Sequence, residues 1–295
     1  MTKVLVIGAQ SIDIFASTKE EYRFHDSNSA KIQMAFGGVG RNIAENLCRL
    51  GHQVSFISVF GDDHFSQMAQ ISLDDMGIYI SESLFLENQK SSVYLGVLDP
   101  ENDLLLGLSD MEIIDHLNPD FLKKKHAIID SFEIILIDNN LSKESLEYLL
   151  ITYSHKKIIM DAVSTEKAKK LVPYLDKISI LKLNQMELDS LTSSKDKYAQ
   201  INELHQLGAR ALLITHQENK VVYSRDGARF ELKPNKMEKI VNATGAGDAF
   251  LSGFVHGILN GFNDQQKLES GQLAAKLTLE SPHSTSTLLS TIEID

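Results

Sequence analysis

The sequence predicts an α/β fold with a mostly parallel central sheet, helices on both of its faces and a small projecting sheet. Short β-branched runs recur along the chain, and most are separated by stretches with helical spacing of apolar residues. Two regions break this alternation with strand-like runs that no helix separates. Strand-helix alternation places successive strands parallel and requires helices on both faces. With 295 residues and only 5 prolines, no long stiff linker is apparent, and we expect one domain over residues 1–295.

The first strand is expected at Val4–Ile7. After it, no helical spacing appears before the glycine pair Gly37-Gly38. The next helix is expected over 42–50, where apolar residues recur at i, i+4 and i+7 and Gly51 follows as a stop signal.

The second interruption of the alternation covers residues 92–111. Val93–Leu98 and Leu104–Leu108 read as two strands, which the turn Asp99–Asp103 would join as a hairpin. We assign the two interruptions, about 14–36 and 88–111, to one small sheet. A projecting sheet beside the main sheet is well placed to cover a ligand as a lid.

The rest of the chain continues the alternation. Further strands are expected at Val54–Val59, Ile134–Ile137, Ile158–Met160, Ile178–Leu181 and Ala211–Thr215. Further helices are expected at Ser142–Tyr153, Ser164–Leu175 and Ile201–Leu207, and an apolar helix carries Phe250, Phe254 and Ile258 on one stripe.

Composition and charge exclude several classes of protein. Hydrophobic residues make up 43% and charged residues 23%, which is typical of a globular chain. The net charge is −11, and no basic run is longer than Lys123–Lys125, so a nucleic acid partner is not expected. Because the net charge repels anions, an anionic substrate would need a local binding site made of groups such as backbone amides.

The chain is expected to be cytoplasmic. Its one cysteine, Cys48, has no intrachain partner, and the N-terminus has no signal-peptide pattern. The longest apolar runs are strand-sized, well below the roughly 18 residues that cross a bilayer, so no membrane partner is expected.

The sharpest motif is Asn242-Ala-Thr-Gly-Ala-Gly-Asp-Ala-Phe250 at the start of the apolar helix. The segment Gly245-Ala246-Gly247 would leave amide N–H groups bare at the positive end of the helix dipole, forming an anion hole. Asp248 at its mouth could take a proton from an attacking hydroxyl. The plain alternative is a turn followed by a first-turn acidic residue.

A second glycine-rich motif, Gly37-Gly-Val-Gly-Arg-Asn42, lies at the start of another helix. Its glycines allow close backbone approach to a polyhydroxylated ligand, and the amide of Asn42 offers both a donor and an acceptor. The motif fits neither a dinucleotide-binding fingerprint nor a phosphate-binding loop with Lys-Ser/Thr.

These motifs, with two others, resemble the ribokinase-like (PfkB) family of carbohydrate and nucleoside kinases over essentially the whole chain. The matching segments, in the family's order and spacing, are Gly8–Asp13, Gly37–Asn42, Asn184–Glu187 and Thr244–Asp248. The resemblance implies a three-layer sandwich with a β-sheet lid, and ATP-dependent phosphorylation of a sugar hydroxyl with Mg²⁺.

Within this family the chain resembles the subgroup that phosphorylates the 5′-hydroxyl of pseudouridine. The segments that carry this likeness are Asp26–Asn28, Phe36–Ala44, Ser109–Met111, Asp138–Ser142, Asp161–Ser164 and Leu181–Asn184. Ribose or another nucleoside as substrate, and a catalytically weak nucleoside-binding regulatory protein, remain as alternatives.

The resemblance also implies roles for residues. Asp13, Gly38 and Asn42 would bind the ribose, whereas Asn139, Asp110 and Met111 would line the pocket around the base. Asp248 would be the general base beside the anion hole of Gly245, Ala246 and Gly247.

On the nucleotide side, Asn184 and Glu187 would hold the magnesium-phosphate water network, Glu187 acting through water. Thr215 and Thr244 would contact the nucleotide. The family's glycines after Thr215 are replaced by residues 216–219, and Asn242 stands where sugar kinases commonly have aspartate. Asn242 could also lie at a site for a monovalent cation such as K⁺. The edges of the lid sheet could pair two copies as a homodimer.

Overall fold

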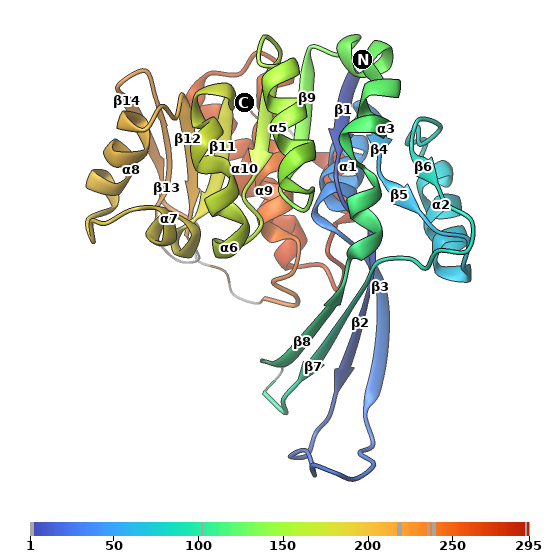
Figure 1. Cartoon of the computed structure of the whole chain (residues 1–295). Coiled ribbons are helices and arrows are strands. Elements are labelled where there is room, and N and C mark those ends of the chain that lie inside the picture. Colours follow the sequence, from blue (N-terminus) through green and yellow to red (C-terminus); the bar gives the residue numbers. More distant parts are fainter. Residues whose placement is uncertain are drawn as a thin grey trace.

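The computed structural model describes residues 3–101, 103–216, 220–234, 237, 240–292 and 294. A large sheet with the strand order β14-β13-β12-β11-β10-β9-β1-β4 forms its centre (Figure 1). All neighbouring strands are parallel except β12-β13 and β13-β14, which are antiparallel. These strands are β1 (Lys3–Ile7), β4 (Gln53–Ile57), β9 (Ile134–Asp138), β10 (Lys157–Asp161), β11 (Ile180–Asn184), β12 (Ala211–Thr215), β13 (Val221–Arg225) and β14 (Ala228–Leu232).

Helices cover both faces of this sheet (Figure 1). The α-helices are α1 (Val39–Arg49), α2 (His64–Asp75), α3 (Pro119–Lys124), α4 (His126–Asp130), α5 (Lys143–Thr152), α6 (Thr165–Ala168), α7 (Gln185–Leu191), α8 (Lys197–Gln206), α9 (Ala246–Leu259) and α10 (Asp264–Leu279). Short 3-10 helices cover Glu112–His116, Lys169–Lys177 and Thr287–Thr291.

Alternation along β1 divides the interior into two cores. Leu5 and Ile7 pack with Leu146 of α5 in one core, whereas Val4 and Val6 pack with residues of α1 and α9 in the other. Successive side chains of a strand point to opposite faces, so both faces of β1 are buried. The predicted three-layer α/β sandwich is confirmed.

A second sheet, which we call the lid, projects from the main body (Figure 1). Its strand order is β3-β2-β7-β8, formed by β2 (Ser11–Ser17), β3 (Lys31–Gly37), β7 (Val93–Leu98) and β8 (Leu104–Asp110). In the turn after β7, the amide of Asp99 donates to the carbonyl of Asp103, and its carboxylate accepts from the amides of Glu101 and Asp103. The lid therefore joins two distant segments of the chain.

The strand register gives the lid two chemically different faces. The face that carries Phe36, here called the outer face, is apolar apart from Asp110. Its apolar residues are Ile12, Ile14, Ala16, Ile32, Met34, Phe36, Val93, Leu95, Val97, Leu106 and Leu108. The inner face carries Asp13 with mainly small, polar and aromatic side chains.

The structure corrects three expected elements. The run Val54–Val59 is divided, because the backbone of Ser58 bonds the segment 83–84, and β5 (Val59–Phe60) pairs with β6 (Leu84–Phe85) in a separate small sheet. The helix expected over Ser164–Leu175 is α-helical only in α6 and then continues as a 3-10 helix that contains Pro173, which has no N–H to donate.

The third correction concerns the start of α1. The helix begins at Val39 rather than at Asn42, because the amide of Asn42 already donates to the carbonyl of Gly38 over 2.9 Å. In the part of the chain that the structure describes, no helix is long and apolar enough to cross a membrane.

Candidate active site

The strands β1, β9, β10 and β11 are parallel, so their carboxyl ends lie along one edge of the large sheet. The chain places polar side chains at these ends, including Asp138, Asp161 and Asn184. In open α/β sheets, ligands bind outside this edge. The helices α1 and α9 contribute the remaining groups of the site.

The N-terminus of α9 has the geometry that the motif predicted. Gly245 is the N-cap at φ 81°, in the left-handed region that favours glycine, and no side chain caps the helix. Its carbonyl accepts the first intrahelical bond, from the amide of Ala249. The amides of Ala246, Gly247 and Asp248 belong to the first turn, which has no intrahelical acceptor, so they can bind an anion.

Asp248 lies in this first turn and is buried. Its Oδ2 accepts a hydrogen bond from Nδ2 of Asn42 over 2.8 Å, across 206 residues of chain. Burial, and then the charge of Asp161, raise the pKa of Asp248 to about 7, whereas Lys182 and the amide of Asn42 act in the opposite direction. The structure thus brings together the predicted base and a predicted ribose ligand.

The turn before α1 requires glycine at two positions. Gly38 has φ 94°, and a Cβ there would lie 2.5 Å from the carbonyl oxygen of Ala9. A Cβ at Gly37 would lie 2.1 Å from Oδ2 of Asp13. The backbone of this turn therefore lies directly against the Asp13 carboxylate.

Asp13 is held by its own strand. Ser11 Oγ donates to Asp13 Oδ1 over 2.8 Å. Burial raises the pKa of Asp13, and the hydrogen bond from Ser11 partly opposes this change. Such a carboxylate, beside bare backbone, fits the recognition of ligand hydroxyls.

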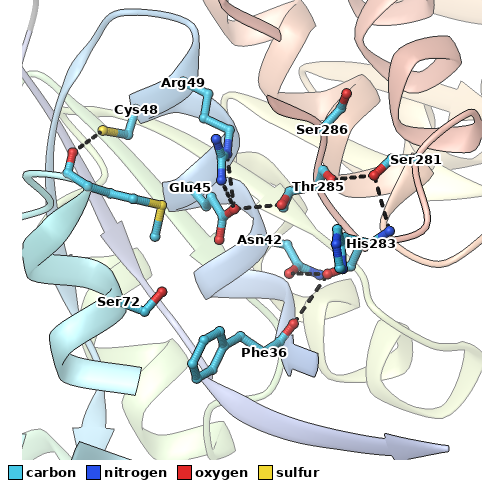
Figure 2. A network of polar contacts seen from close by, with 12 residues as sticks. Phe36, Asn42, Glu45, Cys48, Arg49, Ser72, Ser281, His283, Thr285 and Ser286 are labelled. Carbon is cyan, nitrogen blue, oxygen red and sulfur yellow. Dashed lines mark hydrogen bonds and ion pairs between the residues drawn. The ribbon is translucent and has the colours of Figure 1, made fainter. Parts of the chain in front are cut away.

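A loop after α10, residues 281–286, lies against both helices of the site, and Figure 2 shows its hydrogen bonds to Asn42 and Glu45 of α1. Ser284 Oγ donates to Asn42 Oδ1 and to the carbonyl of Phe36, each over 3.3 Å. Thr285 Oγ1 donates to Glu45 Oε1 over 2.6 Å. A Cβ at Gly245 would lie 2.0 Å from the carbonyl oxygen of Ser284, so the same loop packs against the start of α9. No motif in the sequence marks this loop, so it was not predicted.

A buried ion pair between Lys182 and Asp161 lies beside the anion hole. Lys182 Nζ is 2.8 Å from Asp161 Oδ2 and 3.0 Å from where a Cβ at Gly247 would lie. Burial disfavours the charged amine, but the charges of Asp161, Asp248 and Glu187 outweigh it and raise the pKa of Lys182. Sequence analysis did not single out Lys182, although a lysine inside an otherwise apolar strand was an available signal.

Asp138 is the other group that the sequence analysis did not assign. Its carboxylate is fully buried, and Oδ2 accepts from the amides of Ala9 and Gly40, each over 2.7 Å. Burial raises its pKa, and the amides it binds oppose that change. Asp138 therefore ties the end of β1 to the start of α1.

On the proposed nucleotide side, Asn184 and Glu187 form a capping box on α7. Asn184 Oδ1 accepts from the Glu187 amide over 2.9 Å, and Glu187 Oε2 accepts from the Asn184 amide over 2.8 Å. Burial raises the pKa of Glu187, which Lys182 and the Asn184 amide oppose. Because magnesium usually retains several of its waters, a contact of this carboxylate with the ion through water is compatible with the capping bond.

The other predicted nucleotide residues lie at loop ends. Thr215 ends β12, and its hydroxyl donates to the carbonyl of Leu183 over 3.4 Å. Thr244 is exposed, and its amide donates to Asn242 Oδ1 over 2.9 Å. Asn242 Nδ2 in turn donates to the carbonyl of Pro282 over 3.4 Å, so its side chain joins two loops. In the altered segment after Thr215, positions 217–219 lie outside the described residues.

The three expected base-pocket residues lie in different surroundings. Asn139 is fully buried, and its Nδ2 donates to the carbonyl of Ala162 over 3.2 Å. Asp110 is exposed and, paired with Val93, lies on the outer face of the lid, opposite Asp13. Met111 follows it and is partly buried against the core that contains Leu146 of α5.

Among the described residues, no group of three or more His, Cys, Asp or Glu side chains could hold a metal ion. Those ranges therefore contain no cluster of such side chains that could bind a metal ion directly. A magnesium ion bound mainly by phosphates and waters remains compatible with Glu187.

Several known proteins are similar to this chain in sequence or in fold. Pseudouridine kinase of Escherichia coli (strain K12) is 29% identical over 285 residues, covering 94% of this chain and 90% of the relative. The uncharacterized sugar kinase YeiI of the same strain is 31% identical over 265 residues, covering 88% of this chain and 73% of that protein. The structure of Arabidopsis thaliana ribokinase, complexed with ribose and ATP, matches with a TM-score of 0.83 at 19% identity and covers 99% of each chain.

The family model described as pfkB family carbohydrate kinase matches residues 1–291, nearly the full length of the sequence. The chain therefore belongs to the pfkB family of carbohydrate kinases.

Proposed function

We propose that this protein transfers the γ-phosphoryl group of ATP to the 5′-hydroxyl of a ribosyl compound, with pseudouridine as the substrate and pseudouridine 5′-phosphate as the product. The observation that carries the proposal is the contact between Asn42 and Asp248 at the uncapped start of α9. A base, a ribose ligand and an anion hole lie together there. The relative at 29% identity is a pseudouridine kinase, which supports this choice of substrate.

In the proposed reaction, Asp248 accepts the proton of the 5′-hydroxyl while the 5′ oxygen bonds to the γ-phosphorus. The bond from that phosphorus to the β,γ-bridging oxygen breaks, and ADP leaves. The first-turn amides of α9, with Lys182 beside Gly247, stabilise the negative charge on the transferred group. Asp13 and Asn42 orient the ribose. A magnesium ion would supply charge neutralisation of the phosphates, held near Glu187 through water.

The test compares kcat/KM for pseudouridine, uridine, 2′-deoxyuridine and free ribose with the same Mg²⁺-ATP. Loss of a ribose hydroxyl removes a ligand donor from the Asp13 carboxylate, whose pKa burial already raises, so 2′-deoxyuridine should be a poor substrate compared with uridine. Pseudouridine should exceed uridine by roughly 10-fold or more, because one hydrogen bond to the base edge is worth about 1 kcal/mol. If uridine or ribose equals pseudouridine, the substrate is wrong, and if no riboside is phosphorylated, the whole proposal is wrong.

We also propose that K⁺ raises activity by binding near Asn242, and that the enzyme acts in the cytoplasm. The side chain of Asn242 already joins its loop to Pro282, so a cation there would rely on backbone carbonyls. Activity in KCl against the same concentration of NaCl tests the cation, and equal rates would remove it.

Finally, we propose that two copies associate through the outer face of the lid. Ile32, Leu108 and Met34 on this face are 62%, 52% and 47% exposed. A contiguous apolar surface of this kind marks an interface, and a two-fold dimer pairs the same surface on both subunits. Since the face has only Asp110 as a charged member, a second copy would bury it with little desolvation of charge.

A further inference from the structure

The inner face of the lid carries a group of glycine and aromatic residues to which no role has been assigned above. At its centre, Gly96 of β7 and Gly107 of β8 form a directly opposed pair. Glycine in the interior of a strand weakens the sheet and often marks a close approach by another group. The groups that approach here are two aromatic rings.

The rings of Phe15 and Tyr94 lie over these glycines. A Cβ at Gly96 would lie 2.6 Å from Cδ1 of Phe15, and a Cβ at Gly107 would lie 2.5 Å from the hydroxyl oxygen of Tyr94. The ring centroids are 6.0 Å apart with an interplanar angle of 62°. The glycine pair therefore lets both rings lie close to the sheet, where a larger residue would push them away.

The register places both rings beside the predicted ribose ligand. Tyr94 is the direct neighbour of Asp13 on the adjacent strand, and Phe15 is two residues further along the strand of Asp13, on the same face. Neighbouring strands are about 4.8 Å apart and residues i and i+2 about 6.6 Å apart. This spacing corresponds to the step from the hydroxyls of a ribose to the ring attached at its C1′.

The inner face is also connected through the chain to the proposed catalytic groups. Asp13 lies against Gly37, which leads into α1 and the contact between Asn42 and Asp248. Phe36, on the outer face, lies instead under the guanidinium of Arg41, 4.3 Å from its ring centroid. Phe15 and Tyr94 are half-buried, so part of each remains open to a ligand.

We propose that Phe15 and Tyr94 form a subsite that stacks against the planar base of a nucleoside, and that the lid thereby selects nucleosides over free sugars. This inference rests on the proposed function, because it takes Asp13 as the ribose ligand. It assigns base binding to the inner face of the lid rather than to Asp110 on the outer face. An aromatic ring stacks on any base, so this subsite confers preference for a base and not for one particular base.

The chain contains no tryptophan, so a tryptophan introduced in the subsite gives a direct fluorescence test. In the Tyr94→Trp variant the indole is a single reporter, and stacking of a base should quench its fluorescence. Titration with pseudouridine or uridine should give saturable quenching, whereas ribose at the same concentrations should give none. Equal effects of ribose and nucleosides, or no effect of any ligand, would overturn the proposal. This titration does not depend on catalysis.

Calorimetry supplies the second readout. Phe15→Leu and Tyr94→Leu should each raise the Kd for pseudouridine, measured without ATP, by about 10-fold. The matched control is Phe24→Leu, since Phe24 lies in the loop between β2 and β3, is 80% exposed and should leave the Kd unchanged. Wild-type Kd values in both leucine variants of the subsite would overturn it even if the enzyme phosphorylates pseudouridine. Absence of phosphorylation by the wild type would instead overturn the proposed function.

Discussion

The carboxylate of Asp248 is the group on which the proposed chemistry depends most directly. It is buried, it accepts from Asn42, and it lies in the first turn of α9. Because the base acts in the transition state, Asp248→Asn should lower kcat by about 10² to 10⁴-fold. The Kd for the nucleoside should change little, since the introduced carboxamide fills the same space as the carboxylate. Rapid-quench measurement of kcat with calorimetric Kd checks both, and near-normal turnover would contradict the mechanism.

The charges around Asp248 predict that two substitutions shift the pH dependence of kcat/KM in opposite directions. A general base must be ionised, so kcat/KM should fall as the pH drops through the pKa of Asp248, which burial raises to about 7. The positive charge of Lys182 lowers this pKa and the negative charge of Asp161 raises it. Lys182→Met should therefore move the acid limb of the profile to higher pH, and Asp161→Asn should move it to lower pH.

The measurement is kcat/KM from pH 5 to 9 at saturating Mg²⁺-ATP, with thermal melts in parallel. Either substitution breaks a buried ion pair and lowers stability, so a fall in Tm alone does not show whether the pair acts on the pKa of Asp248. Opposite displacements of the acid limb would support an electrostatic role for the pair. Displacements in the same direction, or none, would contradict it.

At the scale of elements, the loop 281–286 packs closely against the start of α9. Gly245 has φ 81°, and an added Cβ would lie 2.0 Å from the carbonyl oxygen of Ser284. Gly245→Ala should displace this loop and with it the contact of Ser284 to Asn42. We expect kcat/KM to fall by about 10-fold or more, because small misplacements of reacting groups are costly.

The matched control for that variant is Gly261→Ala. Gly261 follows the same helix with φ 72°, but a Cβ there would have nothing within 4 Å. This substitution should cost only the backbone strain of about 1 kcal/mol and leave kcat/KM unchanged. Comparable losses of kcat/KM in both variants would show that strain, and not the loop contact, is responsible.

The sequence predicted the elements best where their signals were local. Six strands of the large sheet and the glycine at the start of α9 follow from β-branched runs and from the Gly-Ala-Gly-Asp motif. The family resemblance implied the separate roles of Asn42 and Asp248, but it did not predict the hydrogen bond between them. The strands β13 and β14 were missed, and their pairing with β12 is antiparallel. The break at Ser58 depends on a hydrogen bond from its amide to the hydroxyl of Ser83, which no local pattern reveals.

The remaining parts of the site depend on contacts between distant segments. Thr285 reaches Glu45 across 240 residues, and Asp138 reaches the amide of Gly40 across 98. The face on which Asp110 lies depends on strand register, and a shift by one residue reverses it. Local patterns in the chain do not determine that register, so the sequence could not predict which face of the lid carries Asp110.

For the whole molecule, the net charge of −11 opposes the approach of a nucleotide. Local positive groups can offset this repulsion, since the amides at the start of α9 and the buried Lys182 lie at the same edge of the sheet. In the proposed mechanism, attraction of phosphate would come from a few oriented groups inside the site. Added salt should therefore affect nucleotide binding less than it would for a basic surface, because buried charges are screened less than exposed ones.

The apolar outer face of the lid leads to a prediction about assembly. Wild-type protein should sediment at twice the chain mass of 32.9 kDa, because the same apolar surface would be covered on both copies. Met34→Glu places a charge on this face, so the charge would be desolvated in the dimer, and the variant should sediment as a monomer. The matched control is Gln33→Glu, which adds the same charge one residue earlier on the exposed strand β3 but on the inner face. That variant should stay dimeric. A monomeric wild type, or equal dissociation of the two variants, would exclude the outer face as the interface.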